Sequence, residues 1–148
     1  MLPIKNSLFL FKVALKGQKK IWRKIAIRGD QTLTALHLAI FKAFDRDDDH
    51  LYSFYFSSKP TSTSRNRLDG ARRYGCPFSE TEDRADITRI DSLRLKVKQK
   101  FEYLFDYGDE WWHEITLEEI HAPQPDLAYP RLIASKGDSP PQYDDSEE

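Results

Sequence analysis

Phe101–Leu117 has the sequence FEYLFDYGDEWWHEITL and contains two candidate β-strands joined by a short acidic turn. Alternation of side chains along a strand places Phe101, Tyr103 and Phe105 on one face of the first strand. One face of the second strand carries Trp111, His113, Ile115 and Leu117. The stretch therefore predicts an antiparallel hairpin with aromatic residues on its buried side.

The turn of this hairpin allows two interpretations. Gly108 is expected to supply the positive φ of a tight turn, and Asp106 and Asp109 are expected to accept hydrogen bonds from turn N–H groups. In the structural interpretation, aromatic pairs across the strands stabilise the hairpin by about 0.2–1 kcal/mol each. In the functional interpretation, Asp106, Asp109 and His113 form a metal or acid–base cluster, because histidine and carboxylate ligands suit zinc or manganese.

The composition indicates one globular domain. The chain has 148 residues, of which 39% are hydrophobic and 32% are charged, so it is long enough to bury an ordinary core. Its single cysteine, Cys76, cannot form an internal disulfide. We found no signal-peptide pattern and no apolar run of membrane-spanning length in it. These features predict a cytoplasmic protein that does not contact a membrane.

Hydrophobic periodicity predicts further strands at Leu8–Leu15, Ile21–Ile27 and Leu51–Phe56, with a hairpin loop at residues 16–20. A helix is predicted after the second of these strands, with Asp30 or Thr32 as its N-cap. The apolar stripe of this helix comprises Leu33, Leu36, His37, Ile40, Phe41 and Phe44.

The remaining segments have weaker patterns. Residues 57–80 are rich in Ser, Thr, Arg, Gly and Pro, and we predict a long surface loop there. A short strand is expected at Asp86–Thr88, and Ile90–Leu95 is expected to be one helical turn or the start of the next strand. After Ile120, five prolines between positions 123 and 141 are expected to exclude regular structure.

Three histidines extend the metal hypothesis. His37 lies in the apolar stripe of the helix, where a hydrogen-bonded core histidine is the ordinary outcome, and His50 follows a run of aspartates. With His113, Asp106 and Asp109 they would form a site for a divalent metal, although no His-Glu-x-x-His spacing supports it. The aspartates of residues 45–49 lack the central glycine and closing glutamate of an EF-hand loop, so a solvated turn is expected there.

Charge is distributed unevenly along the chain, although the net charge is −1. Residues 1–30 hold eight Lys or Arg and one Asp, whereas residues 118–148 hold eight Asp or Glu and two Lys or Arg. Trp22, Lys24 and Arg28 share one face of a predicted strand, and Arg23 lies on the other face. Aromatic residues among cations on a sheet stack bases and neutralise phosphates, so a nucleic-acid-binding surface is one alternative.

Three segments together carry a family pattern. They are Ile21-Trp22-Arg23-Lys24 with the Gly29-Asp30 turn, Leu33-x-x-Leu36-His37 followed by Asp48-x-His50-Leu51-Tyr52-x-Phe54, and Phe101-x-Tyr103-x-Phe105-Asp106-Tyr107-Gly108-Asp109-x-Trp111-x-His113-x-Ile115. In order and spacing the three segments resemble the plasmid pRiA4b ORF-three-like family, which is also labelled insertion-element passenger TnpR-like. The resemblance implies one α+β domain over residues 1–137, in which a bent antiparallel β-sheet packs against one or more helices. It implies no activity.

The chain departs from the family pattern near its end. Family members usually have cysteines there, whereas residues 138–144 read DSPPQYD. A metal or redox role that rests on those cysteines is therefore not expected. We predict that residues 138–148 form an acidic, disordered tail.

The leading hypothesis is a non-enzymatic accessory or interaction domain associated with plasmid or mobile-element genes. It would need no cofactor and would bind a protein through the aromatic–acidic hairpin and the Arg-rich loop of residues 57–80. The first alternative is a nucleic-acid-binding module that uses Trp22, Arg23, Lys24 and Arg28. The second is a metal-dependent enzyme with a site built from His37, His50, Asp106, Asp109 and His113, beside Trp111.

Overall fold

The structure is a computed structural model, and it describes residues 7–57, 71–76, 83–122, 124 and 126–142. It contains one eight-stranded sheet in the order β5-β4-β3-β6-β7-β1-β2-β8. The strands are β1 (Leu8–Leu15), β2 (Gln18–Arg28), β3 (Tyr52–Phe56), β4 (Arg72–Gly75), β5 (Asp83–Arg84), β6 (Lys100–Phe105), β7 (Trp111–His121) and β8 (Arg131–Lys136). One α-helix, α1 (Leu33–Ala43), and a 3₁₀ turn, η2 (Ile90–Leu93), complete the described elements.

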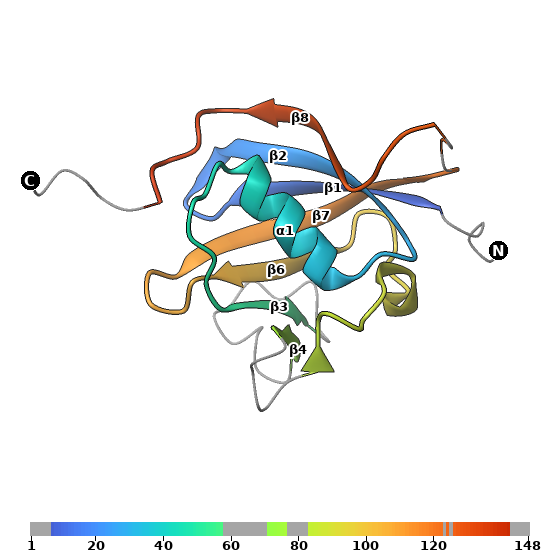
Figure 1. Cartoon of the computed structure of the whole chain (residues 1–148), viewed down its shortest axis with the longest axis horizontal. Helices are drawn as coiled ribbons and strands as arrows, with labels where there is room; N and C mark the ends of the chain where they lie inside the picture. The colour runs from blue at the N-terminus through green and yellow to red at the C-terminus, as the bar shows by residue number, and fades with distance from the viewer. Residues whose placement is uncertain (1–6, 58–70, 77–82, 123, 125, 143–148) are drawn as a thin grey trace, which may run out of the picture.

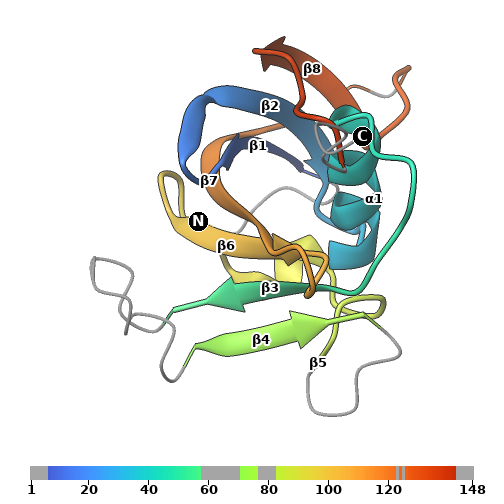
Figure 2. The same ribbon diagram turned by 90° about the vertical axis from the view of Figure 1, so that its left-hand side faces the viewer.

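The sheet curls around α1. Figure 1 shows the helix lying across one face of the sheet, and Figure 2 shows the strands bending around it from β3 and β4 at one side to β8 at the other. Neighbouring strands are antiparallel except β4 and β5, which are parallel. This arrangement agrees with the expected α+β class, with a single helix as the covering layer.

The core lies between the concave face of the sheet and α1. Alternate residues of the central strands point into it, as Phe11 and Val13 do on β1 and Ile25 and Ile27 do on β2, all with no exposed surface. Phe101, Tyr103 and Phe105 are buried on β6, as the hairpin pattern predicted. Full burial of such a side chain contributes roughly 1.5–3 kcal/mol, so this face holds the fold together.

The helix begins and ends at residues that suit its termini. The Thr32 side chain accepts a hydrogen bond from the Ala35 amide at 3.2 Å, which confirms Thr32 as the N-cap. Asp30 is not the cap, and its carboxylate instead pairs with Arg28 at 3.0 Å. At the other end Asp45 has a φ of 53°, so the left-handed conformation there turns the chain out of the helix.

The structure corrects three sequence-based predictions. β4 lies within residues 57–80, which were expected to be a loop, and residues 58–70 and 77–80 of that stretch lie outside the described residues. β8 lies within the proline-containing stretch that was expected to exclude regular structure. Both strands are short: β4 pairs with β3 and β5, and β8 pairs with β2, more than a hundred residues away in the chain. The prolines flank β8 without interrupting it, because residues 131–136 contain none. Asp86–Thr88 is a turn and not a strand, whereas Ile90–Leu93 forms the expected helical turn.

The chain after β8 contacts the domain. The Ser139 hydroxyl donates to the Phe44 carbonyl at 2.6 Å. The Gln142 side chain accepts from the amides of Asp47 and Asp48 at 2.8 and 3.1 Å and donates to the Asp48 carbonyl at 2.7 Å. Of the predicted acidic tail, residues 143–148 lie outside the described residues. None of the described helices has the length and hydropathy needed to cross a membrane.

Candidate functional site

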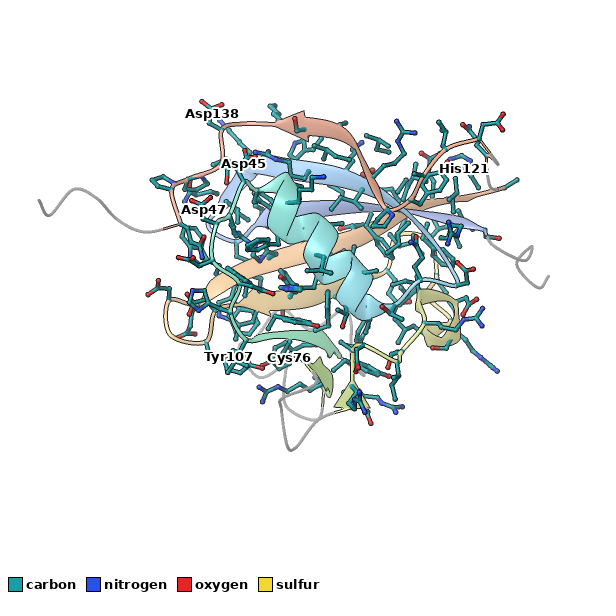
Figure 3. All side chains as sticks on the ribbon, viewed as in Figure 1. Asp45, Asp47, Cys76, Tyr107, His121 and Asp138 are labelled. Carbon is teal, nitrogen blue, oxygen red and sulfur yellow. The ribbon has the colours of Figure 1, made fainter. Side chains whose placement is uncertain are left out.

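A polar cluster lies inside the apolar core where the loop after α1 meets the β6–β7 hairpin. We define the polar cluster as His37, Arg46, Asp49, Tyr103 and His113. The end of the molecule that carries this loop also carries Asp45, Asp47 and Asp138, whereas His121 lies at the opposite end (Figure 3). Of the cluster, only Asp49 has a side chain that is largely open to solvent, at 54%.

His37 links the helix, the sheet and the loop. Its Nε2 lies 2.9 Å from Asp49 Oδ1, and its Nδ1 lies 2.6 Å from the Tyr103 hydroxyl. Because a carboxylate only accepts, Nε2 carries the proton and donates to Asp49, and Nδ1 accepts from Tyr103. The ring also stacks on Tyr52, with ring centroids 3.6 Å apart.

Burial and hydrogen bonding set the protonation states of these groups. Burial lowers the pKa of His37 and raises the pKa of the Tyr103 hydroxyl well above its ordinary value. The hydrogen bond from His37 lowers the pKa of Asp49. The chain Tyr103–His37–Asp49 therefore consists of a neutral phenol, a neutral imidazole and a carboxylate. It resembles a proton relay, but Tyr103 has no exposed surface at which a substrate could meet it.

His113 forms the second half of the polar cluster. Arg46 Nη2 lies 2.7 Å from His113 Nε2, and since a guanidinium only donates, Nε2 is the acceptor. His113 Nδ1 then carries the proton and donates to the Tyr103 carbonyl at 3.2 Å. Burial, followed by the charge of Arg46, holds the pKa of His113 well below its ordinary value. The imidazole is thus neutral and has both nitrogens engaged.

Arg46 is a buried cation in an aromatic cage. Its guanidinium carbon lies 5.0 Å from the ring centroid of Phe44, 4.9 Å from that of Phe105 and 5.6 Å from that of Trp111. Such contacts contribute about 0.5–2 kcal/mol each and compensate part of the loss of hydration. Burial lowers the pKa of Arg46 to about 10. Arg46 Nη1 and Trp111 Nε1 are buried without an acceptor among the described residues.

The hairpin turn has a different geometry from the one expected. Positive φ occurs at Asp106 and Glu110, at 66° and 53°, and not at Gly108. Asp106 Oδ1 accepts from the amides of Gly108 and Asp109 at 3.0 and 3.2 Å, as expected of a turn carboxylate. Its Oδ2 lies 3.5 Å from His50 Nε2. Asp106 therefore satisfies the backbone of the turn, whereas Asp109 is exposed and contributes its amide.

The geometry does not favour a metal site built from these residues. Among the described residues, no three His, Cys, Asp or Glu side chains lie close enough together to hold a metal ion. His37 and His113 have both ring nitrogens engaged, and the cation of Arg46 lies beside His113. His50 pairs with the buried Asp106, and Asp109 contacts Asp106 through its backbone amide; no contact among the described residues joins the Asp109 carboxylate to them.

The candidates of the basic front end lie on opposite faces of β2. Trp22 is on the outer face, with Lys12 Nζ 5.2 Å and Lys24 Nζ 5.3 Å from its ring centroid. Arg28, on the same face, pairs with Asp30 at 3.0 Å. Arg23 is buried on the inner face and donates to the Ala43 carbonyl at 2.9 Å, so it connects β2 to the end of α1.

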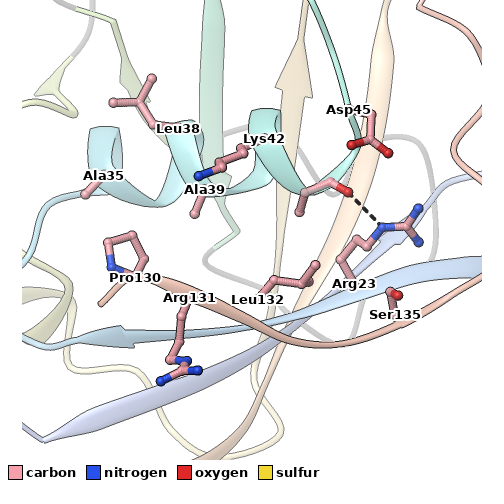
Figure 4. A pocket seen from close by; sticks show the side chains of 11 residues that line it. Arg23, Ala35, Leu38, Ala39, Lys42, Asp45, Pro130, Arg131, Leu132 and Ser135 are labelled. Atoms are coloured by element: carbon pink, nitrogen blue, oxygen red, sulfur yellow. Dashed lines mark hydrogen bonds between the residues drawn. The ribbon is translucent and has the colours of Figure 1, made fainter. Parts of the chain in front are cut away.

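Sequence reasoning missed a groove of about 710 Å³ between α1 and β8. Figure 4 shows Leu38, Ala39 and Lys42 on the helix side of the groove and Arg131 and Leu132 on the strand side. Leu38 and Leu132 both line the groove and are 51% and 48% exposed; in Figure 4 Leu38 points away from β8, and Ala39 lies on the side of the helix that faces the strand. The sequence did contain one sign of this groove: Leu38 lies outside the apolar stripe of the helix, which predicts an exposed leucine on the helix surface.

Comparisons with known proteins agree with this fold. The chain is 29% identical over 141 residues to the uncharacterized protein y4hQ of Sinorhizobium fredii (strain NBRC 101917 / NGR234); the match covers 92% of this chain and 66% of y4hQ, just under two-thirds of that relative. The structure is similar to the crystal structure of a protein of unknown function, MM3350, from Methanosarcina mazei Go1, with a TM-score of 0.77 and 23% identity. That similarity covers 94% of this chain and 74% of the other. The model of the plasmid pRiA4b ORF-3-like protein family matches residues 7–145, and the chain therefore belongs to that family.

Proposed function

We propose that this chain is a non-enzymatic protein-interaction domain whose working surface is the groove between α1 and β8. An accessory role beside plasmid or mobile-element genes is part of the same proposal. The observation that carries it is the pair of half-exposed leucines, Leu38 and Leu132, on either side of an open groove. Exposed apolar residues that gather in a concave surface are typical of a protein-binding site.

The state of the polar cluster supports a non-enzymatic role. A catalytic acid, base or nucleophile must lie within hydrogen-bonding reach of a substrate. Tyr103, His37 and His113 are each at most 1% exposed, and their hydrogen-bonding atoms are satisfied by one another, by Arg46 or by Asp49. Their arrangement is suited to fixing the loop after α1 against the sheet.

A photo-crosslinking experiment tests the proposal. A photoreactive amino acid replaces Leu38 in the groove, and in the control variant it replaces Ile87, which is 67% exposed on the turn after β5. We expect a specific protein adduct from position 38 and none of the same mass from position 87. The purified partner should then bind the intact chain and bind the Leu132→Glu variant at least about tenfold more weakly.

Two results would contradict this function. Identical adducts from positions 38 and 87 would mean that the groove has no selective partner. Unchanged affinity of the purified partner for Leu132→Glu would mean that it binds elsewhere. Circular dichroism of each variant serves as the control that the fold is intact.

The outer face of β1 and β2 supports a second candidate, nucleic-acid binding. Trp22 lies between Lys12 and Lys24 there, and Lys19 and Lys20 are exposed at the start of β2. Oligonucleotide affinity measured at several salt concentrations tests it, because each phosphate contact adds to the salt dependence. Replacing Lys12 and Lys19 with alanine should reduce the slope of log affinity against log salt by about one for each lysine that contacts a phosphate. Binding without salt dependence would exclude this candidate.

A further inference from the structure

We propose that the groove between α1 and β8 receives an extended, acidic segment of a partner protein, which adds as a further strand to the free edge of β8. This inference rests on the proposed function, because it specifies the chemistry of the partner that the groove binds. Its basis is the combination of an open strand edge, an apolar floor and uncompensated cations at one place.

The free edge of β8 is the longest one that the described sheet offers. β8 is the last strand in the sheet order and pairs with β2 alone among the described strands. It has six residues, five of them exposed, and Figure 1 shows it at the rim of the molecule. The opposite edge is β5, which has only two residues. A strand edge presents unpaired backbone N–H and C=O groups to an incoming segment, and only β8 is long enough to hold one in register.

The floor of the groove suits the side chains of such a strand. Leu132 on β8 lies on the strand side of the groove, and Ala35, Leu38 and Ala39 on α1 line its helix side. Every second side chain of an added strand would point toward the helix. An apolar side chain at these positions would cover the two leucines and remove their exposed surface from water.

Three cations beside the groove have no ion-pair partner in the described part of the chain. Lys42, Arg131 and Lys136 are exposed and form no ion pair with another described residue. Three lysines elsewhere on the sheet are paired with glutamates instead. These pairs are Lys16–Glu102, Lys24–Glu118 and Lys100–Glu114. Asp45 is the single acidic residue that lines the groove, so the charge left uncompensated there is positive.

Two other occupants fit less well. In an antiparallel pairing of β8 with β8 of a second copy, Arg131 of one chain would lie near Lys136 of the other, and like charges opposite each other destabilise a strand pair. A nucleic acid would match the positive charge, but it has no peptide groups to pair with the strand edge and would place a charged backbone over Leu38 and Leu132. An acidic peptide strand would pair with the backbone of β8, cover the apolar residues of the groove and neutralise its positive charge.

Binding of defined probes to the full chain tests this inference. The main probe is a fluorescent peptide of about eight residues that alternates glutamate with valine, the length of an ordinary strand. The variant Arg131→Glu/Lys136→Glu should weaken its binding about tenfold or more, because these two side chains lie on the face of β8 toward which the glutamates of the added strand would point. The matched control, Arg94→Glu/Lys96→Glu, changes the net charge equally on the segment after η2, and it should change the affinity less than about twofold. Amide chemical shifts should change in β8 and on the exposed face of α1.

Control probes isolate each part of the inference. A peptide with lysine in place of glutamate tests the charge, a version N-methylated at alternate residues tests the backbone pairing, and a single-stranded oligonucleotide tests the alternative macromolecule. We expect the first two to bind at least about tenfold more weakly than the main probe, and the oligonucleotide not to displace it.

The inference is overturned if the glutamate peptide does not bind, if the lysine or N-methylated peptide binds equally well, or if the oligonucleotide competes. The crosslinking experiment separates this failure from failure of the proposed function. A partner protein that crosslinks from position 38 and depends on Leu132 would sustain the interaction domain even when an acidic strand is the wrong occupant.

Discussion

Removal of the Tyr103 hydroxyl provides a direct test of the polar cluster. In Tyr103→Phe the ring keeps its place between His37 and His113, and only the O–H that donates to His37 Nδ1 is lost. The variant therefore separates the hydrogen bond from the packing of the ring. It also leaves a buried imidazole nitrogen without a donor.

The expected loss of stability in Tyr103→Phe depends on how deeply the hydrogen bond is buried. A typical hydrogen bond contributes about 1 kcal/mol net, but a buried acceptor that loses its partner costs about 1–3 kcal/mol. Tyr103 is 0% exposed and His37 is 1% exposed, so water cannot easily replace the hydroxyl. We expect Tyr103→Phe to lower the free energy of unfolding by about 2 kcal/mol. In a chain of this size that corresponds to a fall in Tm of about 4–8 °C.

The assay is urea unfolding followed by tryptophan fluorescence, with two companion variants. Asp49→Ala removes the acceptor at the other nitrogen of His37, but the Asp49 side chain is 54% exposed and water can take its place. It should therefore cost less, about 0.5–1 kcal/mol. Tyr74→Phe removes a hydroxyl that has no hydrogen-bond partner among the described residues, and it should change stability by less than about 0.5 kcal/mol.

The order of the stability losses in the three variants tests whether the buried hydrogen bond stabilises the fold. A loss below about 0.5 kcal/mol for Tyr103→Phe would mean that the hydrogen bond is absent or is replaced by solvent. A larger loss for Asp49→Ala than for Tyr103→Phe would mean that stability depends on the surface pair and not on the buried one.

Three further predictions concern the loop, the histidines and the last turn. Gln142→Ala should speed amide exchange in the loop after α1, because three hydrogen bonds are lost, and unchanged exchange would contradict the contact. The pKa values of His37 and His113 are lowered below 6.5 on folding, so the unfolded chain binds more protons and unfolding free energy should fall as pH drops below about 6.5. Urea titrations at several pH values measure that slope. Gly137→Ala should cost at least about 1 kcal/mol more than Gly17→Ala, by thermal denaturation. Both glycines have positive φ, but a Cβ at Gly137 would lie 2.9 Å from Ile21 Cγ1, whereas one at Gly17 meets nothing within 4 Å.

The features that the sequence predicted well are those with a local periodic pattern. The β6–β7 hairpin, β1, β2 and the N-cap of α1 each follow from residues within one short window. β8 pairs with β2 across more than a hundred residues, and its own sequence, RLIASK, has no regular alternation. No local signal predicts such a strand, because its stability comes from the edge that β2 provides.

Prediction of the candidate site from the sequence was limited in the same way, because the contacts are long-range. The histidines were recognised individually, but their partners lie far along the chain, 66 residues away for His37 and Tyr103 and 67 residues away for Arg46 and His113. A histidine in an apolar stripe predicts burial, and the structure has His37 buried. Which atom satisfies each nitrogen depends on the long-range register between the loop and the sheet, and a single sequence does not contain that register.

Arg46 determines whether the buried histidines could bind a metal. A metal site requires imidazole nitrogens with free lone pairs and a field that attracts cations. Arg46 occupies the lone pair of His113 Nε2 at 2.7 Å and lowers the pKa of that ring through its charge. Two unit charges about 4 Å apart repel by several kcal/mol where water is partly excluded, so a divalent cation beside this guanidinium would be strongly disfavoured. The aromatic residues that make the hairpin resemble a binding site are the ones that hold Arg46 in place. The polar cluster thus fastens the loop to the sheet, and its geometry disfavours a metal ion beside these histidines.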